Sequence, residues 1–137
     1  MTSDELADYL VDHFNDLSDP IVAFQAIKPE TVAEAQKERA DYGVYVLPYE
    51  ESETPLDRGD TCNEQRVVSV VVNGPLKTVT RSTAMQFCEQ LRRALRETTF
   101  NGYRWSGNET VSIFDANALK EKDQFLSLFR ATYFTIA

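Results

Sequence analysis

The sequence predicts an α+β fold, with a mainly antiparallel sheet of four to five strands and helices packed on one face. Three observations support this class. Apolar residues recur at steps of three and four near the N-terminus and again over Thr78–Thr99, which indicates two amphipathic helices. Runs rich in valine and aromatic residues lie between and after these helices, which indicates strands. The chain has 137 residues, and we expect residues 1–137 to form a single domain.

The N-terminal part begins with a capped helix. Thr2 and Glu5 fit a capping box, and the apolar spacing after them predicts a helix that ends near Asp16. The segment 21–27 follows as a short strand. The segment 29–39 starts with a proline, which suits the first turn of a helix, and predicts a short and mostly polar helix.

The clearest strand signals lie on either side of a polar segment. Gly43–Tyr49 and Glu64–Asn73 predict two paired strands, and Glu50–Asn63 predicts a long loop that projects from them. The charged residues of this loop are Glu50, Glu51, Glu53, Asp57, Arg58 and Asp60. A loop of this length is either a solvated connection or a projecting arm that reaches a partner or lines a passage, and we favour contact with a partner.

The C-terminal half combines one helix with more strands. Thr78–Thr99 has the most regular apolar face in the chain, and Asn101-Gly102 ends it. We expect short strands at Tyr103–Trp105 and Thr110–Phe114, with a turn between them. Phe125–Ile136 predicts a long strand, although its spacing also suits a helix.

The predicted strands are apolar on both faces. Val44 and Val46 alternate with Tyr45 and Leu47, and the run 67–72 is almost entirely valine. Either the sheet curls and buries both faces within one chain, or a neighbouring subunit covers the second face. The residues predicted to form such an interface are Val68, Val70, Val72, Phe129 and Tyr133, with the helix arginines Arg92, Arg93 and Arg96. The arginines are either solvated or ion-pair donors to a neighbour.

Composition excludes several classes of function. The 22 acids and 14 bases give a formal net charge of -8, which argues against a basic surface that binds nucleic acid. Neither of the two longest apolar runs approaches the length of a membrane span. Two cysteines, Cys62 and Cys88, are too few for a disulfide framework, and we expect free thiols in a soluble protein that folds in a reducing cytoplasm.

No catalytic, cofactor-binding or metal-binding residues are predicted. The single histidine, His13, lies on the apolar-leaning side of the first helix and suits packing better than catalysis. No cysteine and histidine spacing fits zinc, and no phosphate-binding loop is present. The segment Asp115–Asn117 is only a fragment of a calcium loop. We therefore expect a protein that is not an enzyme.

The order of these segments resembles the tail terminator (tail completion) proteins of long-tailed bacteriophages. The resemblance extends over nearly the whole chain and rests on layout, with no single diagnostic motif. Its parts are the capped helix, Gly-Val-Tyr-Val-Leu-Pro before a polar loop, Gln-Arg-Val-Val-Ser-Val-Val-Val, a helix with Phe-Cys-Glu-Gln-Leu-Arg-Arg-Ala-Leu, a Tyr-x-Trp strand and Phe-x-x-x-Phe-Arg-Ala-Thr-Tyr-Phe-Thr.

The resemblance implies a virion structural protein without catalytic residues. Such a subunit forms a ring, expected to be a hexamer, that caps the tail tube, ends its polymerisation and joins the tail to the head–neck connector protein. DNA passes through the lumen without specific binding, and the negative net charge is consistent with this. Two alternatives stay open: another neck protein, such as a head-closure or adaptor protein, and a small cytoplasmic binding domain or enzyme.

Overall fold

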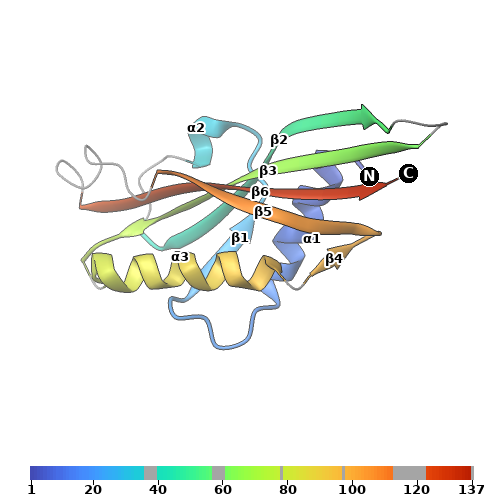
Figure 1. Ribbon diagram of the computed structural model, residues 1–137. Coiled ribbons are helices and arrows are strands. Elements are labelled where there is room, and N and C mark those ends of the chain that lie inside the picture. The colour runs from blue at the N-terminus through green and yellow to red at the C-terminus, as the bar shows by residue number, and fades with distance from the viewer. Residues whose placement is uncertain (36–39, 57–60, 78, 97, 113–122, 137) are drawn as a thin grey trace.

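The computed structural model describes residues 1–35, 40–56, 61–77, 79–96, 98–112 and 123–136. These residues form one six-stranded sheet and three helices (Figure 1). The elements are α1 (Ser3–Asn15), β1 (Phe24–Ile27), α2 (Val32–Ala35), β2 (Tyr42–Pro55), β3 (Cys62–Pro75), α3 (Arg81–Arg96), β4 (Thr99–Phe100), β5 (Tyr103–Ser112) and β6 (Gln124–Ile136). The α+β class is confirmed.

The sheet is larger and more mixed than predicted. Its strand order is β1-β2-β3-β6-β5-β4, which is six strands where four to five were expected. The short β1 pairs with β2 in parallel, and the other neighbouring strands pair antiparallel. The parallel pair arises because the chain crosses from β1 to β2 through the α2 segment instead of a tight turn.

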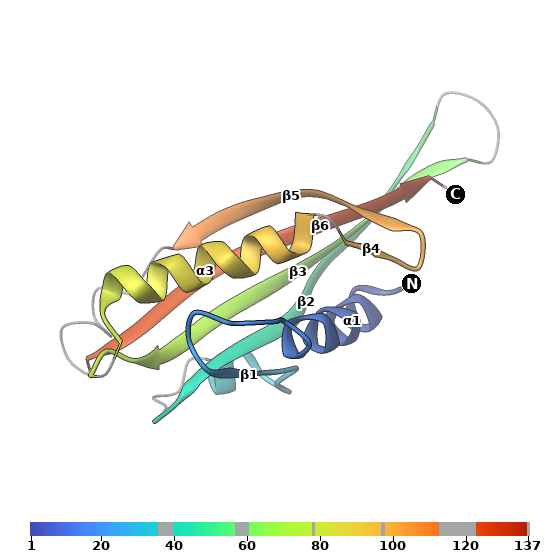
Figure 2. The same ribbon diagram turned by 90° about the horizontal axis from the view of Figure 1, so that it is seen from below.

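The helices cover the two faces of the sheet unequally. Figures 1 and 2 show α1 and α3 side by side on one face, while α2 lies on the other. The prediction that the helices share one face holds for α1 and α3 and is wrong for α2. We call the face under α1 and α3 the inner face and the opposite one the outer face.

The main core lies between the inner face and the two long helices. From α1 it takes Leu6, Leu10 and Phe14, and from α3 it takes Phe87 and Leu91, all without exposure to solvent. The sheet contributes Val44, Val46, Val68, Val70, Val72, Phe125, Phe129, Ala131 and Tyr133. A smaller core on the outer face joins Ala35 of α2 to Tyr45, Leu47 and Val71. The alternation predicted for the strands is therefore confirmed.

The first helix begins as predicted. The Thr2 hydroxyl accepts a hydrogen bond from the backbone N–H of Glu5 at 3.1 Å and lies 3.4 Å from the Glu5 carboxylate. This contact satisfies one of the N–H groups that every helix N-terminus leaves without an intrahelical partner. Asp16 closes the helix as its C-cap, at the predicted end.

Two predicted loops are strands in the structure. Residues Glu50–Pro55 continue β2 and pair with Cys62–Val67 of β3, so most of the predicted polar loop is a hairpin. β5 likewise runs unbroken through the predicted turn, with a register shift between Trp105 and Gly107. The long C-terminal strand is confirmed as β6, and the helical alternative for it is wrong. The segment Asp115–Asn117 lies outside the described residues.

β4 and β5 form a hairpin that the sequence reading missed. Phe100 pairs with Tyr103 across a two-residue turn of Asn101 and Gly102. Both turn residues have positive φ, 49° and 82°, which is the conformation that an Asn-Gly turn supplies at low cost. The helix ends earlier, at Arg96, so Asn101-Gly102 does not end it as predicted but joins β4 to β5. The turn places Tyr103 next to the start of the hairpin described next.

Candidate functional site

The most prominent projection of the molecule is the distal end of the β2–β3 hairpin, which we call the arm (Glu50–Pro55 with Cys62–Val67). Figure 2 shows it extending past both long helices. β6 pairs with β3 along most of the arm, up to Asn63–Ile136, and the Pro55–Cys62 pair of β2 and β3 lies beyond that point. The predicted loop residues Glu50, Glu51 and Glu53 lie on the arm, while Asp57, Arg58 and Asp60 lie outside the described residues.

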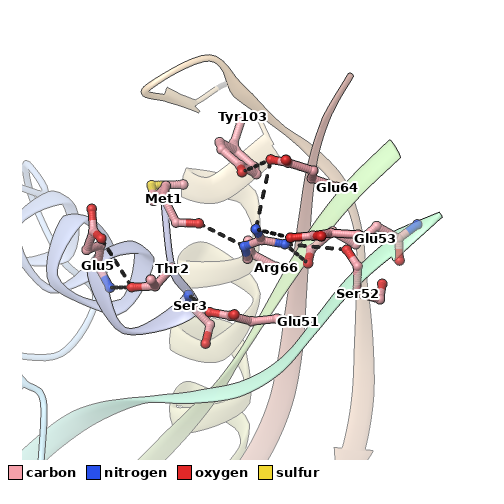
Figure 3. Close-up of polar contacts among 11 residues, drawn as sticks. Met1, Thr2, Ser3, Glu5, Glu51, Ser52, Glu53, Glu64, Arg66 and Tyr103 are labelled. Carbon is pink, nitrogen blue, oxygen red and sulfur yellow. Dashed lines mark hydrogen bonds and ion pairs between the residues drawn. The ribbon is translucent and has the colours of Figure 1, made fainter. Parts of the chain in front are cut away.

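A buried arginine holds the base of the arm (Figure 3). Arg66 of β3 is only 6% exposed and points to the inner face, in the same alternation as Val68 and Val70. Its guanidinium donates to the backbone carbonyls of Met1 at 2.8 Å and Gln65 at 2.9 Å, and more weakly to Ser52. These bonds tie the residues before α1 to both strands of the arm.

Carboxylates surround this guanidinium. Glu53 lies 3.4 Å and Glu64 3.9 Å from Nη2 of Arg66. Glu64 also accepts a hydrogen bond of 2.5 Å from the Tyr103 hydroxyl, and the Arg66 guanidinium lies 5.7 Å from the Tyr103 ring centre. Burial, followed by the bond to Glu64, raises the pKa of Tyr103 to about 12. Tyr103 therefore stays protonated and keeps donating to Glu64 over the physiological pH range.

A second contact joins the arm to the first helix. The carboxylate of Glu51 accepts a hydrogen bond of 2.5 Å from the backbone N–H of Ser3. That bond is the main reason why the pKa of Glu51 is lowered, so the contact is made by the ionised form. The arm thus leaves the sheet in a direction set by α1, β3 and β5.

The predicted interface residues of the strands lie in the core instead. Val68, Val70, Val72, Phe129 and Tyr133 have no exposure and pack beneath α1 and α3 of the same chain. The prediction that they contact a neighbouring subunit is wrong for this reason. Their apolar character is accounted for by the helices, and the Tyr133 hydroxyl is bonded to the Leu95 carbonyl at 3.1 Å.

The outer face retains an open apolar band, which we call the outer strip. α2 covers only the end of this face around Tyr45, and the band continues from there toward the arm. Its members are Tyr49, Val67, Leu128, Arg130, Phe134 and Ile136. Tyr49 is 51% and Ile136 61% exposed, while the other members are half-buried. Arg130 lies over the Tyr49 ring, 3.9 Å from its centre.

The three predicted arginines lie on α3, and of these Arg92 reaches the edge of the core. Arg93 and Arg96 are exposed, and Arg93 forms an ion pair of 2.6 Å with Glu89 one turn earlier. Arg92 is half-buried, with its guanidinium 5.8 Å from the Phe129 ring centre and its carbonyl accepting from Asn108 of β5. The structure therefore brings Arg92 to the predicted interface residue Phe129, while Arg93 and Arg96 stay exposed. The arginines and the outer strip lie on opposite faces of the sheet.

His13 and the cysteines occupy packing positions. His13 Nε2 lies 2.8 Å from the Ala94 carbonyl, and its ring meets Phe100 edge-on at 5.7 Å. Both cysteines are free thiols, as predicted. Cys88 is buried within the α3 core, and burial raises the pKa of its thiol to about 11. Cys62 is half-buried at the start of β3.

Sequence reasoning did not single out Arg66 or Tyr103. A signal for Arg66 was present, because it continues the inward alternation of Val68, Val70 and Val72. A charged residue at an inward position must be paired or hydrogen-bonded. No comparable signal identifies Tyr103 as its neighbour, because that contact depends on the β4–β5 turn.

No protein-family model and no curated protein matches the chain. Among the described residues, no helix is both long and apolar enough to span a membrane. Within the same ranges, no three potential ligands among histidine, cysteine, aspartate and glutamate side chains gather where they could hold a metal ion.

Proposed function

We propose that this chain is a tail terminator (tail completion) protein of a long-tailed bacteriophage. In this role it is a virion subunit that forms a ring, expected to be hexameric, on the end of the tail tube. The ring stops tube polymerisation and joins the tail to the head–neck connector, and DNA passes through its lumen. The protein assembles in the host cytoplasm and ends in the neck region of the virion.

The observation that carries the proposal is the outer strip. An antiparallel sheet covered on one face usually presents polar side chains on the other, whereas this face presents Tyr49, Phe134 and Ile136. Exposed apolar patches of this kind mark protein interfaces. The chain's own helices leave the strip open, which supports a protein that is completed by assembly with others.

The arm and the strip form one continuous surface, because both are built from β2, β3 and β6. A single partner that runs along this surface would meet the apolar side chains of the strip first and the outward polar residues of the arm at the end, because Glu51 and Glu53 point to the inner face with Arg66. In a ring, every subunit presents the same surface in the same direction, which suits a partner that is itself a repeating ring. The tail tube is such a partner, and we assign the outer strip and the arm to it.

The test is made in two stages with the purified chain. Native mass spectrometry and negative-stain electron microscopy are expected to show closed rings of six copies. The rings are then added to the tail tube protein of the same virus while it polymerises, and elongation is expected to stop. Rings that leave tube growth unchanged would favour a head-closure or adaptor protein, and a chain that stays monomeric even with tubes present would contradict the proposal.

A further inference from the structure

The two long helices carry opposite charge on their solvent faces. α1 bears Asp4, Glu5, Asp8 and Asp12 and no lysine or arginine. α3 bears four arginines and one glutamate, with the arginines at positions 81, 92, 93 and 96. In a chain with a net charge of -8, a helix with an excess of positive charge is a local exception.

The acidic face of α1 is turned toward the β1 edge of the molecule. Asp4 and Asp8 both reach Lys28, which follows β1, at 3.2 Å and 2.9 Å. Asn15 on the same flank bonds the backbone of Ala26 in β1 at both its N–H and its carbonyl. Asp12 lies between these positions on the helix and is exposed. Since β1 is the first strand of the sheet, the acids lie at one lateral edge.

Arg92 and Arg96 lie four residues apart and share the flank of α3 that is turned toward the opposite edge, while Arg93 lies on the exposed face between the two flanks. Arg92 lies over Phe129 and its carbonyl accepts from Asn108 of β5, which is the last long strand on that side. The other flank of α3 faces the α1 side, because Gln90 bonds the backbone of Asp19 and Ile21. Figure 2 shows the two helices at separate lateral positions on the sheet.

The opposite charges of the two edges favour a head-to-tail contact between two copies over a two-fold contact. A two-fold contact through either edge would place acids against acids or arginines against arginines, and like charges across an interface are costly. A head-to-tail contact places the arginine edge of one copy against the acidic edge of the next. Contacts of this heterologous kind generate rings when the rotation between copies closes.

We propose that the docking partner of the α3 arginine face is the α1 acidic face of a second copy of this chain, in a head-to-tail contact. This inference rests on the proposed ring, and it adds which surfaces of neighbouring subunits meet in that ring. The charges set orientation and register, because exposed ion pairs contribute little affinity individually. The contact leaves the outer strip and the arm free for the tube.

The test is a charge swap in the full chain. One variant combines Arg93→Glu with Arg96→Glu, and the other combines Asp8→Lys with Asp12→Lys; all four side chains are exposed, so the fold should persist. A control, Glu30→Lys with Glu34→Lys, shifts the net charge as the second variant does but lies at α2, on the other side of the sheet. Native mass spectrometry and sedimentation measure assembly, and circular dichroism checks folding.

Each swapped variant alone is expected to lose self-association by about a hundredfold, while the control assembles like the wild type. An equimolar mixture of the two swapped variants is expected to assemble through the restored pairs of opposite charge. Swapped variants that assemble like the wild type, or a mixture that does not recover, would overturn the inference, as would a wild-type chain that never self-associates. Rings with the expected swap behaviour that fail to stop tube growth would instead overturn only the proposed function.

Discussion

At the scale of single residues, Arg66 connects the parts of the molecule that the candidate function needs. It is the one buried side chain among the described residues that bears a full positive charge, and it bonds both strands of the arm and the residues before α1. A guanidinium suits this place because its planar fork serves several carbonyls at once, which a lysine ammonium cannot do with the same geometry.

We expect Arg66→Ala to lower the free energy of unfolding by about 2–3 kcal/mol, because backbone carbonyls lose their donor and Glu64 loses a nearby positive charge at a buried site. Arg66→Lys should lose less, since it keeps the charge. Urea unfolding at fixed protein concentration measures both through the midpoint. A midpoint for Arg66→Ala equal to that of the wild type would show that the network is not required for stability.

The buried thiol and tyrosines predict a loss of stability in alkali. Burial raises the pKa of Cys88 from 9.0 to about 11, so the unfolded chain loses this proton first as the pH rises. The resulting stability is complete below pH 9 and disappears toward pH 11, with a contribution of roughly 2–3 kcal/mol. The pKa values of Tyr42 and Tyr103, raised to about 12, act in the same direction at higher pH.

Cys88→Ala should therefore show a shallower decline of unfolding free energy between pH 9 and pH 11 than the wild type. The comparison is of slopes, because the substitution also leaves a small cavity.

In the native protein at pH 8, a thiol reagent should modify Cys62 well before Cys88, because Cys88 is buried. In denaturant the reagent should modify both thiols. Equal rates for the two thiols in the native protein would contradict the burial of Cys88.

At the scale of elements, the sequence predicted the long helices and the long strands well and the arm poorly. The helices and inner strands bury one face each, which leaves a periodic apolar pattern. The arm is exposed on most sides, so Glu50–Thr54 lacks that pattern and reads as a loop although its backbone is paired. The segment of β5 around Gly107 was predicted to be a turn for a related reason. It contains a register shift, and the residues that fit such an irregularity in a strand are also typical of turns.

The same limit explains the misplaced interface. Alternation correctly separates the two faces of β3 and β6, but it does not say which face the helices cover. In the valine run the outward positions include Ser69 and the inward positions are all valine. On β6 the outward positions include Arg130 and Thr132, while the inward positions from Phe125 to Tyr133 include one small polar residue, Ser127. This difference in polarity is the available sign that the inward set, including Val70 and Phe129, belongs to the core.

The arm allows a truncation that leaves the Arg66 network in place. Glu53 and Glu64 are register partners, so residues 54–63 can be replaced by Asn-Gly to close a two-residue hairpin. We expect this variant to fold and to form rings, because α1, α3 and their core are untouched, and to fail in stopping tube growth. The length distribution of tubes in electron micrographs measures this. Normal tube lengths would show that the distal arm is only a solvated connection.

At the scale of the whole molecule, the two faces of the sheet divide the work between folding and assembly. The inner face is filled by the chain's own helices, and among the described residues the outer face is covered only at the α2 end. The acidic and basic edges lie beside the inner core, where they leave the outer strip accessible. A ring built through these edges would place all outer strips on one side, facing the same partner.

This division predicts opposite outcomes for charged substitutions on the two faces. Val70→Asp places an unpaired charge in a position without exposure and should cost about 4 kcal/mol or more, so that the single chain unfolds. Tyr49→Asp combined with Ile136→Asp changes two exposed side chains of the outer strip and should leave the fold and the rings intact while weakening binding to the tube.

Circular dichroism and native mass spectrometry separate folding from assembly, and cosedimentation with tubes measures binding. A double variant that binds tubes like the wild type would remove the outer strip from the proposed contact, and a Val70→Asp chain that folds but stays monomeric would return the valine face to the subunit interface.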